Sequence, residues 1–293
     1  MNDTLKRILP KFALFSAALI WGSSFFIVKN TVDIFPTNFL LAIRFTIGCL
    51  LLCVLFPKKL TQLNRTCLWQ GIVLGLLIFT AYCIQTIGLT DTTPGKNAFL
   101  TAAYCILVPF LYWITDKRRP DLYNFSAAFL CLAGIGLVSF DGSFSMRFGD
   151  AMTLISALFF AAHIVAGARF GGKSDPILLT ILQFGTAAVC SWVLGFTTET
   201  FPKEIPLNAA LGLLYLAVFA TTIALLLQNI GLKFADPTSG AILLSLESVF
   251  GVLFSMLFYQ ERLTLRLGAG FLLIFIAVIL SETKLSFLRK KRS

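Results

Sequence analysis

Charged residues are scarce in this sequence. Only 13% of its 293 residues are Asp, Glu, Lys or Arg, and a single histidine is present. Soluble globular chains carry about 25% charged residues. A water-soluble fold of this length could not cover its surface with so little charge, and a disordered chain or a coiled coil would be more polar. These classes are excluded, and the sequence predicts a polytopic membrane protein.

The usual signatures of catalytic and metal-binding proteins are also missing. There is no Walker loop, no GxSxG elbow, no channel filter and no voltage-sensor pattern. The lone His163 excludes a centre with several histidines, and the seven cysteines, none with CxxC spacing, are predicted to be small core residues. We therefore expect no enzymatic activity, no cofactor and no metal.

Long apolar runs dominate what is present, with 57% apolar residues. A helix that crosses the bilayer core needs about 17–25 mostly apolar residues. The runs are continuously apolar, whereas strands of a membrane barrel would alternate, so they predict helices. Ten segments meet the criterion, namely 12–28, 37–56, 67–88, 96–114, 122–140, 150–168, 176–196, 207–231, 238–259 and 265–281.

Basic residues in the loops predict the orientation. With the N-terminus in the cytoplasm, 17 Lys and Arg residues fall on the inner side and 6 on the outer side. Both termini are therefore expected in the cytoplasm of a cell whose inner membrane holds the chain. The net charge of +10 then reflects topology rather than nucleic-acid binding. The C-terminal cluster 289–292 is a topology anchor or, alternatively, a contact for anionic lipid headgroups.

The two halves of the chain resemble each other. The pentapeptide QTIGL at 85–89 reappears as QNIGL at 228–232, an interval of 143 residues, and Pro94 matches Pro237 at the same interval. Each half holds five predicted spans, so the second half must be inserted upside down. We therefore predict two inverted five-helix repeats, residues 1–145 and 146–293, an architecture common in secondary transporters that work by alternating access.

A family resemblance supports this prediction. The stretch GAILLSLESV at 240–249, followed by YQERLT at 259–264, resembles the ninth-helix signature of the EamA branch of the drug/metabolite transporter superfamily. The segment ALIWGSSF at 18–25 is similar to the family's first helix, and 36–45 to its second. Ser248 stands where the family often has proline. The resemblance covers the whole chain and implies ten-helix carriers of small metabolites, often exporters.

Two titratable residues lie inside the spans. Glu247 is about 14 Å deep in the ninth span, where a carboxylate must be paired, protonated or wetted. It is a candidate for carrying a proton or countering a cation, or else a hydrogen-bonded residue that holds helices together. His163 in the sixth span is a second candidate for proton coupling or substrate binding, with an interhelical hydrogen bond as the alternative.

Other polar and aromatic residues are candidates for the lining of a substrate cavity. Gln85 and Gln228 are related by the repeat, as are Tyr104 and Glu247. Tyr82 lies three residues before Gln85 and shares its helix face. Trp21 lies near the bilayer midplane, which is unusual for tryptophan. Interhelical hydrogen bonds and simple packing are the alternatives for these side chains.

Two further charged residues receive structural interpretations. Arg44 lies about 10 Å below the outer surface and could bind an anionic group. We instead expect it to snorkel outward or to pair with a helix end. Glu261 is expected to reach water at the end of the ninth span. The motif Gly71-x-x-x-Gly75 permits close helix packing and leaves both a monomer and a homodimer open.

Together these features predict an inner-membrane secondary transporter for a small organic metabolite, such as an amino acid or related solute, possibly an exporter. Its partners would be this solute, the lipid bilayer and, as a candidate coupling ion, the proton. A flippase for lipids or lipid precursors would use the same fold. An intramembrane enzyme is a third class, although no cluster of acid, base and nucleophile is found.

Overall fold

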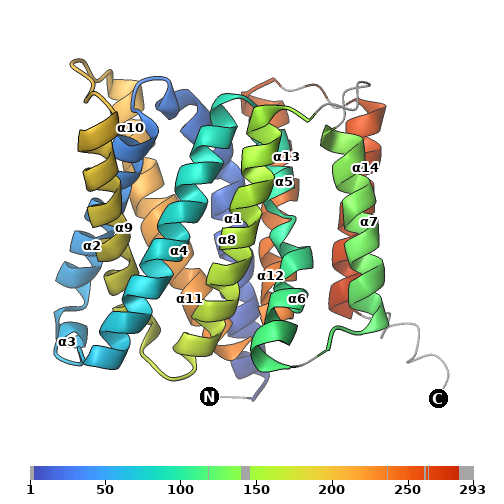
Figure 1. Cartoon of the computed structure of the whole chain (residues 1–293), viewed down its shortest axis with the longest axis horizontal. Helices are drawn as coiled ribbons and strands as arrows, with labels where there is room; N and C mark the ends of the chain where they lie inside the picture. Colours follow the sequence, from blue (N-terminus) through green and yellow to red (C-terminus); the bar gives the residue numbers. More distant parts are fainter. Residues whose placement is uncertain are drawn as a thin grey trace.

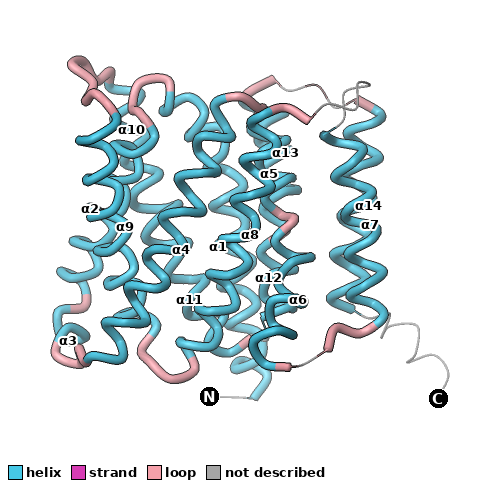
Figure 2. Tube along the Cα trace, viewed as in Figure 1, coloured by secondary structure: helices cyan, strands magenta, loops and turns pink. Residues whose placement is uncertain are grey.

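The computed structural model describes residues 3–117, 119–139, 146–235, 237–260, 262 and 264–283. This part of the chain is helical and contains no strand. The helices run across the molecule side by side, and the loops gather at its two ends (Figures 1 and 2). In chain order they are α1 (Asp3–Val32), α2 (Thr37–Leu55), α3 (Pro57–Leu60), α4 (Arg65–Thr90), α5 (Pro94–Thr101), α6 (Tyr104–Asp116), α7 (Leu122–Ser139), α8 (Phe148–Gly171), α9 (Pro176–Thr198), α10 (Leu207–Tyr215), η1 (Leu216–Ile223), α11 (Ala224–Phe234), α12 (Pro237–Leu244), α13 (Leu246–Phe258) and α14 (Leu265–Thr283).

Seven helical segments of the described chain are long and apolar enough to cross a membrane, and three shorter apolar helices accompany them. This confirms the predicted all-helical membrane class, while the count of ten crossings stays a prediction. The start of α1 and the end of α14 lie at the same end of the bundle (Figure 1). Residue 145 at the predicted boundary of the repeats, Glu261 and the basic cluster 289–292 lie outside the described residues.

Two predicted spans are not continuous helices. Segment 96–114 is interrupted between α5 and α6, and segment 238–259 is interrupted between α12 and α13. Figure 2 shows a non-helical interruption of this kind halfway along the bundle. The first helix of each broken span begins at a proline, Pro94 in α5 and Pro237 in α12. The breaks themselves contain neither glycine nor proline, so the apolar pattern conceals them.

Both breaks are closed by the same tight turn. The N–H of Cys105 donates to the carbonyl of Ala102 at 3.0 Å, and the N–H of Ser248 donates to the carbonyl of Ser245, also at 3.0 Å. These bonds span three residues rather than the four of an α-helix. They are separated by 143 residues, the interval of the repeated pentapeptide. Each break therefore creates a new helix N-terminus inside the bundle, at α6 and at α13.

The predicted span 207–231 also departs from a regular helix. Its middle, η1, is a π-helix. The wider turn leaves room for Thr222 to donate its hydroxyl to the carbonyl of Ala217, five residues earlier, at 2.8 Å. Such segments change which side chains and carbonyls face the interior and are frequent at functional sites.

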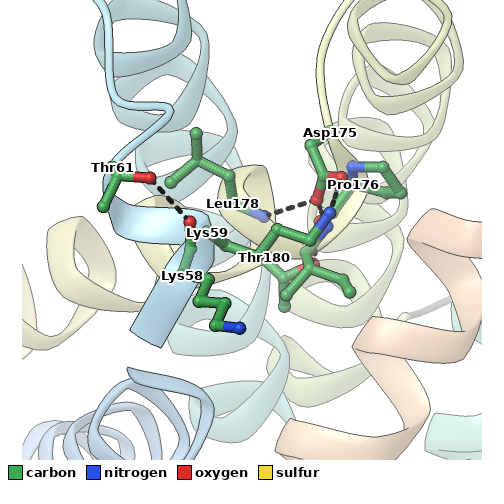
Figure 3. Close-up of polar contacts among 8 residues, drawn as sticks. Lys58, Lys59, Thr61, Asp175, Pro176, Leu178 and Thr180 are labelled. Carbon is green, nitrogen blue, oxygen red and sulfur yellow. Dashed lines mark hydrogen bonds and ion pairs between the residues drawn. The ribbon is translucent and has the colours of Figure 1, made fainter. Parts of the chain in front are cut away.

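Helices α2 and α9 are joined at both ends. At one end, the Glu199 carboxylate accepts from the backbone N–H groups of Asn38 and Phe39 at 2.9 and 3.1 Å and so caps α2. At the other end, Lys59 of α3, the short helix that directly follows α2, places its Nζ 2.6 Å from Asp175 Oδ2 (Figure 3). Asp175 also caps α9 by accepting from two backbone N–H groups. The α2–α9 pair is thereby fixed as a unit.

These contacts lower the pKa of the Asp175 carboxyl group. Partial burial acts to raise its pKa, but the hydrogen bond from Lys59 and the backbone N–H groups of Leu178 and Ile177 outweigh burial. The pKa of Asp175 therefore lies below its ordinary value of 3.8.

Small residues allow α4 and α9 to pack closely. A side chain at Gly71 would collide with Leu182, and one at Gly75 with Thr186. The motif predicted to support helix packing is therefore used inside the chain rather than on an outer surface. All seven cysteines are free thiols, buried or half-buried, as predicted for small core residues.

Candidate functional site

A buried pocket lies among helices of both halves of the chain, with a cavity volume of about 30 Å³. This is the volume open to the centre of a water molecule, and roughly 10–15 Å³ of it is needed for each water, so the cavity has room for about two water molecules. Of the seven side chains predicted for a substrate site, six line this pocket and His163 does not. The six are Trp21, Tyr82, Gln85, Tyr104, Gln228 and Glu247.

Glu247 enters the pocket from the interrupted helix. It lies in the first turn of α13, just after the break, and is only 4% exposed. The N-terminus of a helix carries partial positive charge, and Glu247 lies in the first turn beyond it. The break thus makes it possible to hold a carboxyl group in the interior of the bundle.

Tyr104 occupies the matching position in the first half. It is the first residue of α6, and its ring lies in the same pocket as Glu247. Its hydroxyl is buried, has no hydrogen-bond partner among the described residues, and interacts electrostatically with the Glu247 carboxyl. A buried hydroxyl without a partner is unfavourable, so it is available to a ligand.

Arg44 is the main residue that sequence reasoning misplaced. It does not snorkel outward, because it is 1% exposed and lines the pocket. Its Nε donates to the hydroxyl of Thr221 in η1 at 2.9 Å, and its guanidinium carbon lies 5.1 Å from the centre of the Tyr82 ring. One terminal nitrogen, Nη1, is buried without a partner among the described residues. The pocket therefore holds one cation and one carboxyl group.

The position of Arg44 could not be read from its depth alone. A charge inside a span is a signal of function, but about 10 Å of depth also permits snorkelling. What decides the direction is Thr221, which the π-helix turns toward α2, together with the face of Tyr82. Neither contact has a local sequence signature.

Trp21 is fixed at the wall of the pocket. Its indole N–H donates to the carbonyl of Ala220 in η1 at 2.7 Å. This bond ties α1 to the π-helix and explains how tryptophan is accommodated deep within the bundle. Phe160, from α8, was not predicted, yet it lines the pocket and contacts the Tyr82 ring edge-on at 5.3 Å. With 30 phenylalanines in the chain, no sequence signal marks it.

The two repeat-related glutamines both line the pocket, but each is held separately. Gln85 donates from Nε2 to the hydroxyl of Thr101 at 2.8 Å. Gln228 lies with its Nε2 3.2 Å from His163 Nδ1. The expected polar pair is thus present as two anchored amides, one from α4 and one from α11.

His163 lies behind the pocket wall, fully buried. Its Nε2 is 2.9 Å from Gln183 Oε1, and its Nδ1 faces the amide of Gln228. An amide oxygen accepts and an amide nitrogen donates, so this arrangement fits a neutral ring with its proton on Nε2. The geometry favours the interhelical hydrogen bond over a freely titrating group. His163 therefore positions Gln228 rather than lining the cavity.

These observations define a multi-pass helical membrane protein built around a small internal pocket that holds one guanidinium group, Arg44, and one carboxyl group, Glu247. Comparison with known proteins agrees with this class. The EamA-like transporter family model matches residues 9–140 and again residues 147–283, and the chain belongs to this family. It is thus a membrane transporter of the drug/metabolite type, as the sequence resemblance implied.

Individual relatives have similar lengths. A protein of Archaeoglobus fulgidus, whose name describes it as a transporter, is 34% identical over 95% of this chain and 87% of its own length. Protein PecM of Dickeya dadantii is 24% identical over 95% and 94%. The Escherichia coli inner membrane transporter YedA is 25% identical over 75% and 73%. One crystal structure superposes with a TM-score of 0.73 at 19% identity, covering 97% of this chain and 99% of that one, which shows a shared fold.

Proposed function

We propose that this protein is a secondary transporter that moves a small zwitterionic organic solute, an amino acid or a related metabolite, across the cytoplasmic membrane by alternating access. The single observation that carries the proposal is the presence of Arg44 and Glu247 in one buried pocket. The Arg44 guanidinium would take the carboxylate of the solute, and Glu247 would take its ammonium group.

The neutral part of the solute would contact the aromatic side chains of the pocket. Trp21, Tyr82, Tyr104 and Phe160 supply ring faces to an apolar body, and the hydroxyl of Tyr104, beside Glu247, is a hydrogen-bond donor. A pocket with both charges favours such a compact solute over a whole lipid, whose acyl chains need an apolar path. This argument weighs against the flippase alternative.

The small size of the cavity supports alternating access as part of the proposal. A volume of about 30 Å³ cannot hold an amino acid, so the helices around it must move apart for loading. We propose ten crossings arranged as two inverted repeats, with both termini in the cytoplasm. The matching breaks at Ala102 and Ser245 support the repeat, because equivalent half-helices then meet at one site.

Proton coupling at Glu247 is part of the proposal. In the loaded state the carboxylate would be balanced by the ammonium group, and in the returning state by a proton. The two cations would therefore compete for one carboxyl group. His163 acts indirectly, by holding Gln228 in the wall of the pocket.

The proposal is tested by uptake of the twenty proteinogenic ¹⁴C-labelled amino acids, one at a time, into proteoliposomes that contain the purified protein, with and without a pH gradient. We expect saturable uptake of a subset that responds to the gradient. Glu247→Gln should lose this uptake. Glu204 is an exposed loop residue, so Glu204→Gln makes the same chemical change away from the pocket and is the matched control, which should transport like the wild type. The proposal would be contradicted if, for every amino acid, uptake into proteoliposomes equalled uptake into liposomes without the protein.

A further inference from the structure

A second cavity lies on the opposite side of α13 from Glu247. It has a volume of about 360 Å³ and is lined by α13 and α14, together with Phe99 of α5, whose ring contacts that of Phe271 in α14. Apart from Ser245, Ser248 and Gly268, its lining consists of apolar side chains. In Figure 1, α14 stands beside α7 at the edge of the bundle. We call this cavity the α13–α14 groove.

The groove is open toward the surroundings of the bundle. Leu253, Met256 and Leu272 line it and are 50%, 38% and 58% exposed. These side chains belong to apolar helices of a membrane protein, so they are exposed to lipid rather than to water. Along α13 the lining runs from Ser245 to Met256, about 16 Å at 1.5 Å per residue. That length is about half of a ~30 Å hydrocarbon core, the depth of one acyl chain.

One end of the groove lies near the link between its two helices, because Met256 is two residues before the end of α13 and Gly268 is three residues after the start of α14. Arg262 belongs to this loop and is exposed. Arg266 lies in the first turn of α14. Around the helix axis it is about 200° away from Gly268, which lines the groove. Arg262 therefore lies in the link at the end of the groove, between the two helices that form it, whereas Arg266 lies on the other face of α14.

We propose that the α13–α14 groove binds one acyl chain of a phospholipid from the surrounding bilayer, with its anionic headgroup held by Arg262. The groove and the solute pocket share one helical turn. Ser245, Leu246 and Ser248 line the groove, while Glu247 of the same turn lines the pocket. The bound chain packs behind the break in the helix and holds the first turn of α13 in place. The lipid is thus an accessory ligand, and its binding does not depend on the identity of the transported solute.

Binding is measured by native mass spectrometry of the purified full-length protein titrated with phosphatidylglycerol, and separately with phosphatidylcholine of the same acyl chains. We expect one phosphatidylglycerol to be retained more strongly than phosphatidylcholine. Leu253→Trp should fill the groove and abolish this preference. Leu257 lies outside the groove on the same helix and is 71% exposed, so Leu257→Trp is the matched control that should leave binding unchanged.

A second pair of variants tests the headgroup contact without changing the core. Arg262→Gln should weaken the retention of phosphatidylglycerol about fivefold, and Arg266→Gln should weaken it less. Equal retention of both lipids by the wild type, or full retention by Leu253→Trp, would overturn the proposal. A dimer in which cysteines placed at Leu253 crosslink between two chains would also overturn it, because a second copy would then occupy the groove. Amino-acid uptake is read out separately, so the two proposals can fail independently.

Discussion

Arg44 of α2 and Glu247 of α13 line the same buried pocket, although 203 residues separate them in the sequence. Arg44 is held by Thr221 and the face of Tyr82, and Glu247 lies in the first turn of α13 beside Tyr104. Each charge is thus fixed by neutral partners. This leaves both groups able to bind opposite ends of a solute, and the following predictions rest on that arrangement.

Glu247→Gln should reduce uptake at least tenfold and remove its dependence on pH. The amide keeps the size of the side chain but can neither balance an ammonium group nor release a proton, and a charged hydrogen bond is worth about 1.5–3 kcal/mol. Uptake into proteoliposomes between pH 5.5 and 8 is the measurement. A variant that retains both the wild-type rate and the wild-type pH profile would show that Glu247 has no coupling role.

Arg44→Gln should weaken solute binding about tenfold or more, because it removes the partner of the solute carboxylate. Arg44→Lys should recover part of this loss, since it keeps the charge but not the planar donor geometry that reaches both Thr221 and a carboxylate. Binding is followed by scintillation proximity with the transported amino acid. Equal affinity in the wild type and Arg44→Gln would remove Arg44 from the site.

Trp21→Phe should destabilise the protein by about 1 kcal/mol, because the carbonyl of Ala220 loses its donor. Trp21→Ala should in addition weaken solute binding. Thermal unfolding in detergent measures the first effect. Trp69 is 64% exposed, so Trp69→Phe is the matched control and should leave the midpoint unchanged. Identical midpoints for Trp21→Phe and the wild type would mean that the bond contributes nothing.

His163→Asn should lower the rate of uptake through the loosened Gln228 but leave the shape of its pH profile unchanged. A neutral ring held between two amides is not expected to titrate during transport. The comparison with Gln228→Leu tests this, since both variants should affect the same step. A pH profile that moves in His163→Asn would show that the ring itself carries the proton.

Lys59→Met should remove a pH-dependent contribution to stability. The pKa of Asp175 lies below 3.8 in the folded protein, so its ion pair stabilises the fold above about pH 4 and ceases to do so as the pH falls through the folded value. The pair is partly exposed, and we expect less than about 1 kcal/mol. Unfolding midpoints of the wild type and Lys59→Met should therefore converge in acid. Lys58, which is exposed and lies beside Lys59 in Figure 3, supplies the control Lys58→Met.

Much of the fold could be predicted because membrane helices leave a strong local signal. Continuous apolar runs identified the segments, and two of the helices begin at a proline, Pro94 and Pro237, a residue that is common in the first turn of a helix. The breaks after Thr101 and Leu244 could not be predicted, since Ala and Ser are compatible with a helix and only the packing of the bundle interrupts it. The π-helix is hidden for the same reason.

The candidate site was predicted in outline because polar and aromatic residues at mid-bilayer depth are rare. Trp21 and Glu247 were selected as candidates in this way, and the repeat interval connected Tyr104 to Glu247; all three line the pocket. Arg44 was assigned the wrong direction, because its orientation depends on Thr221 on a distant segment. Phe160 carried no signal, since phenylalanine is common throughout the chain.

The most direct test of the account compares three ligands that share one side chain. These are the transported amino acid, the amine with hydrogen in place of its carboxyl group, and the carboxylic acid with hydrogen in place of its amino group. Each is used to compete for binding to the wild type. We predict that only the amino acid competes strongly, and that each single-charge analogue is weaker by about tenfold or more. If either analogue competes as well as the amino acid, Arg44 and Glu247 do not bind the two ends of one solute.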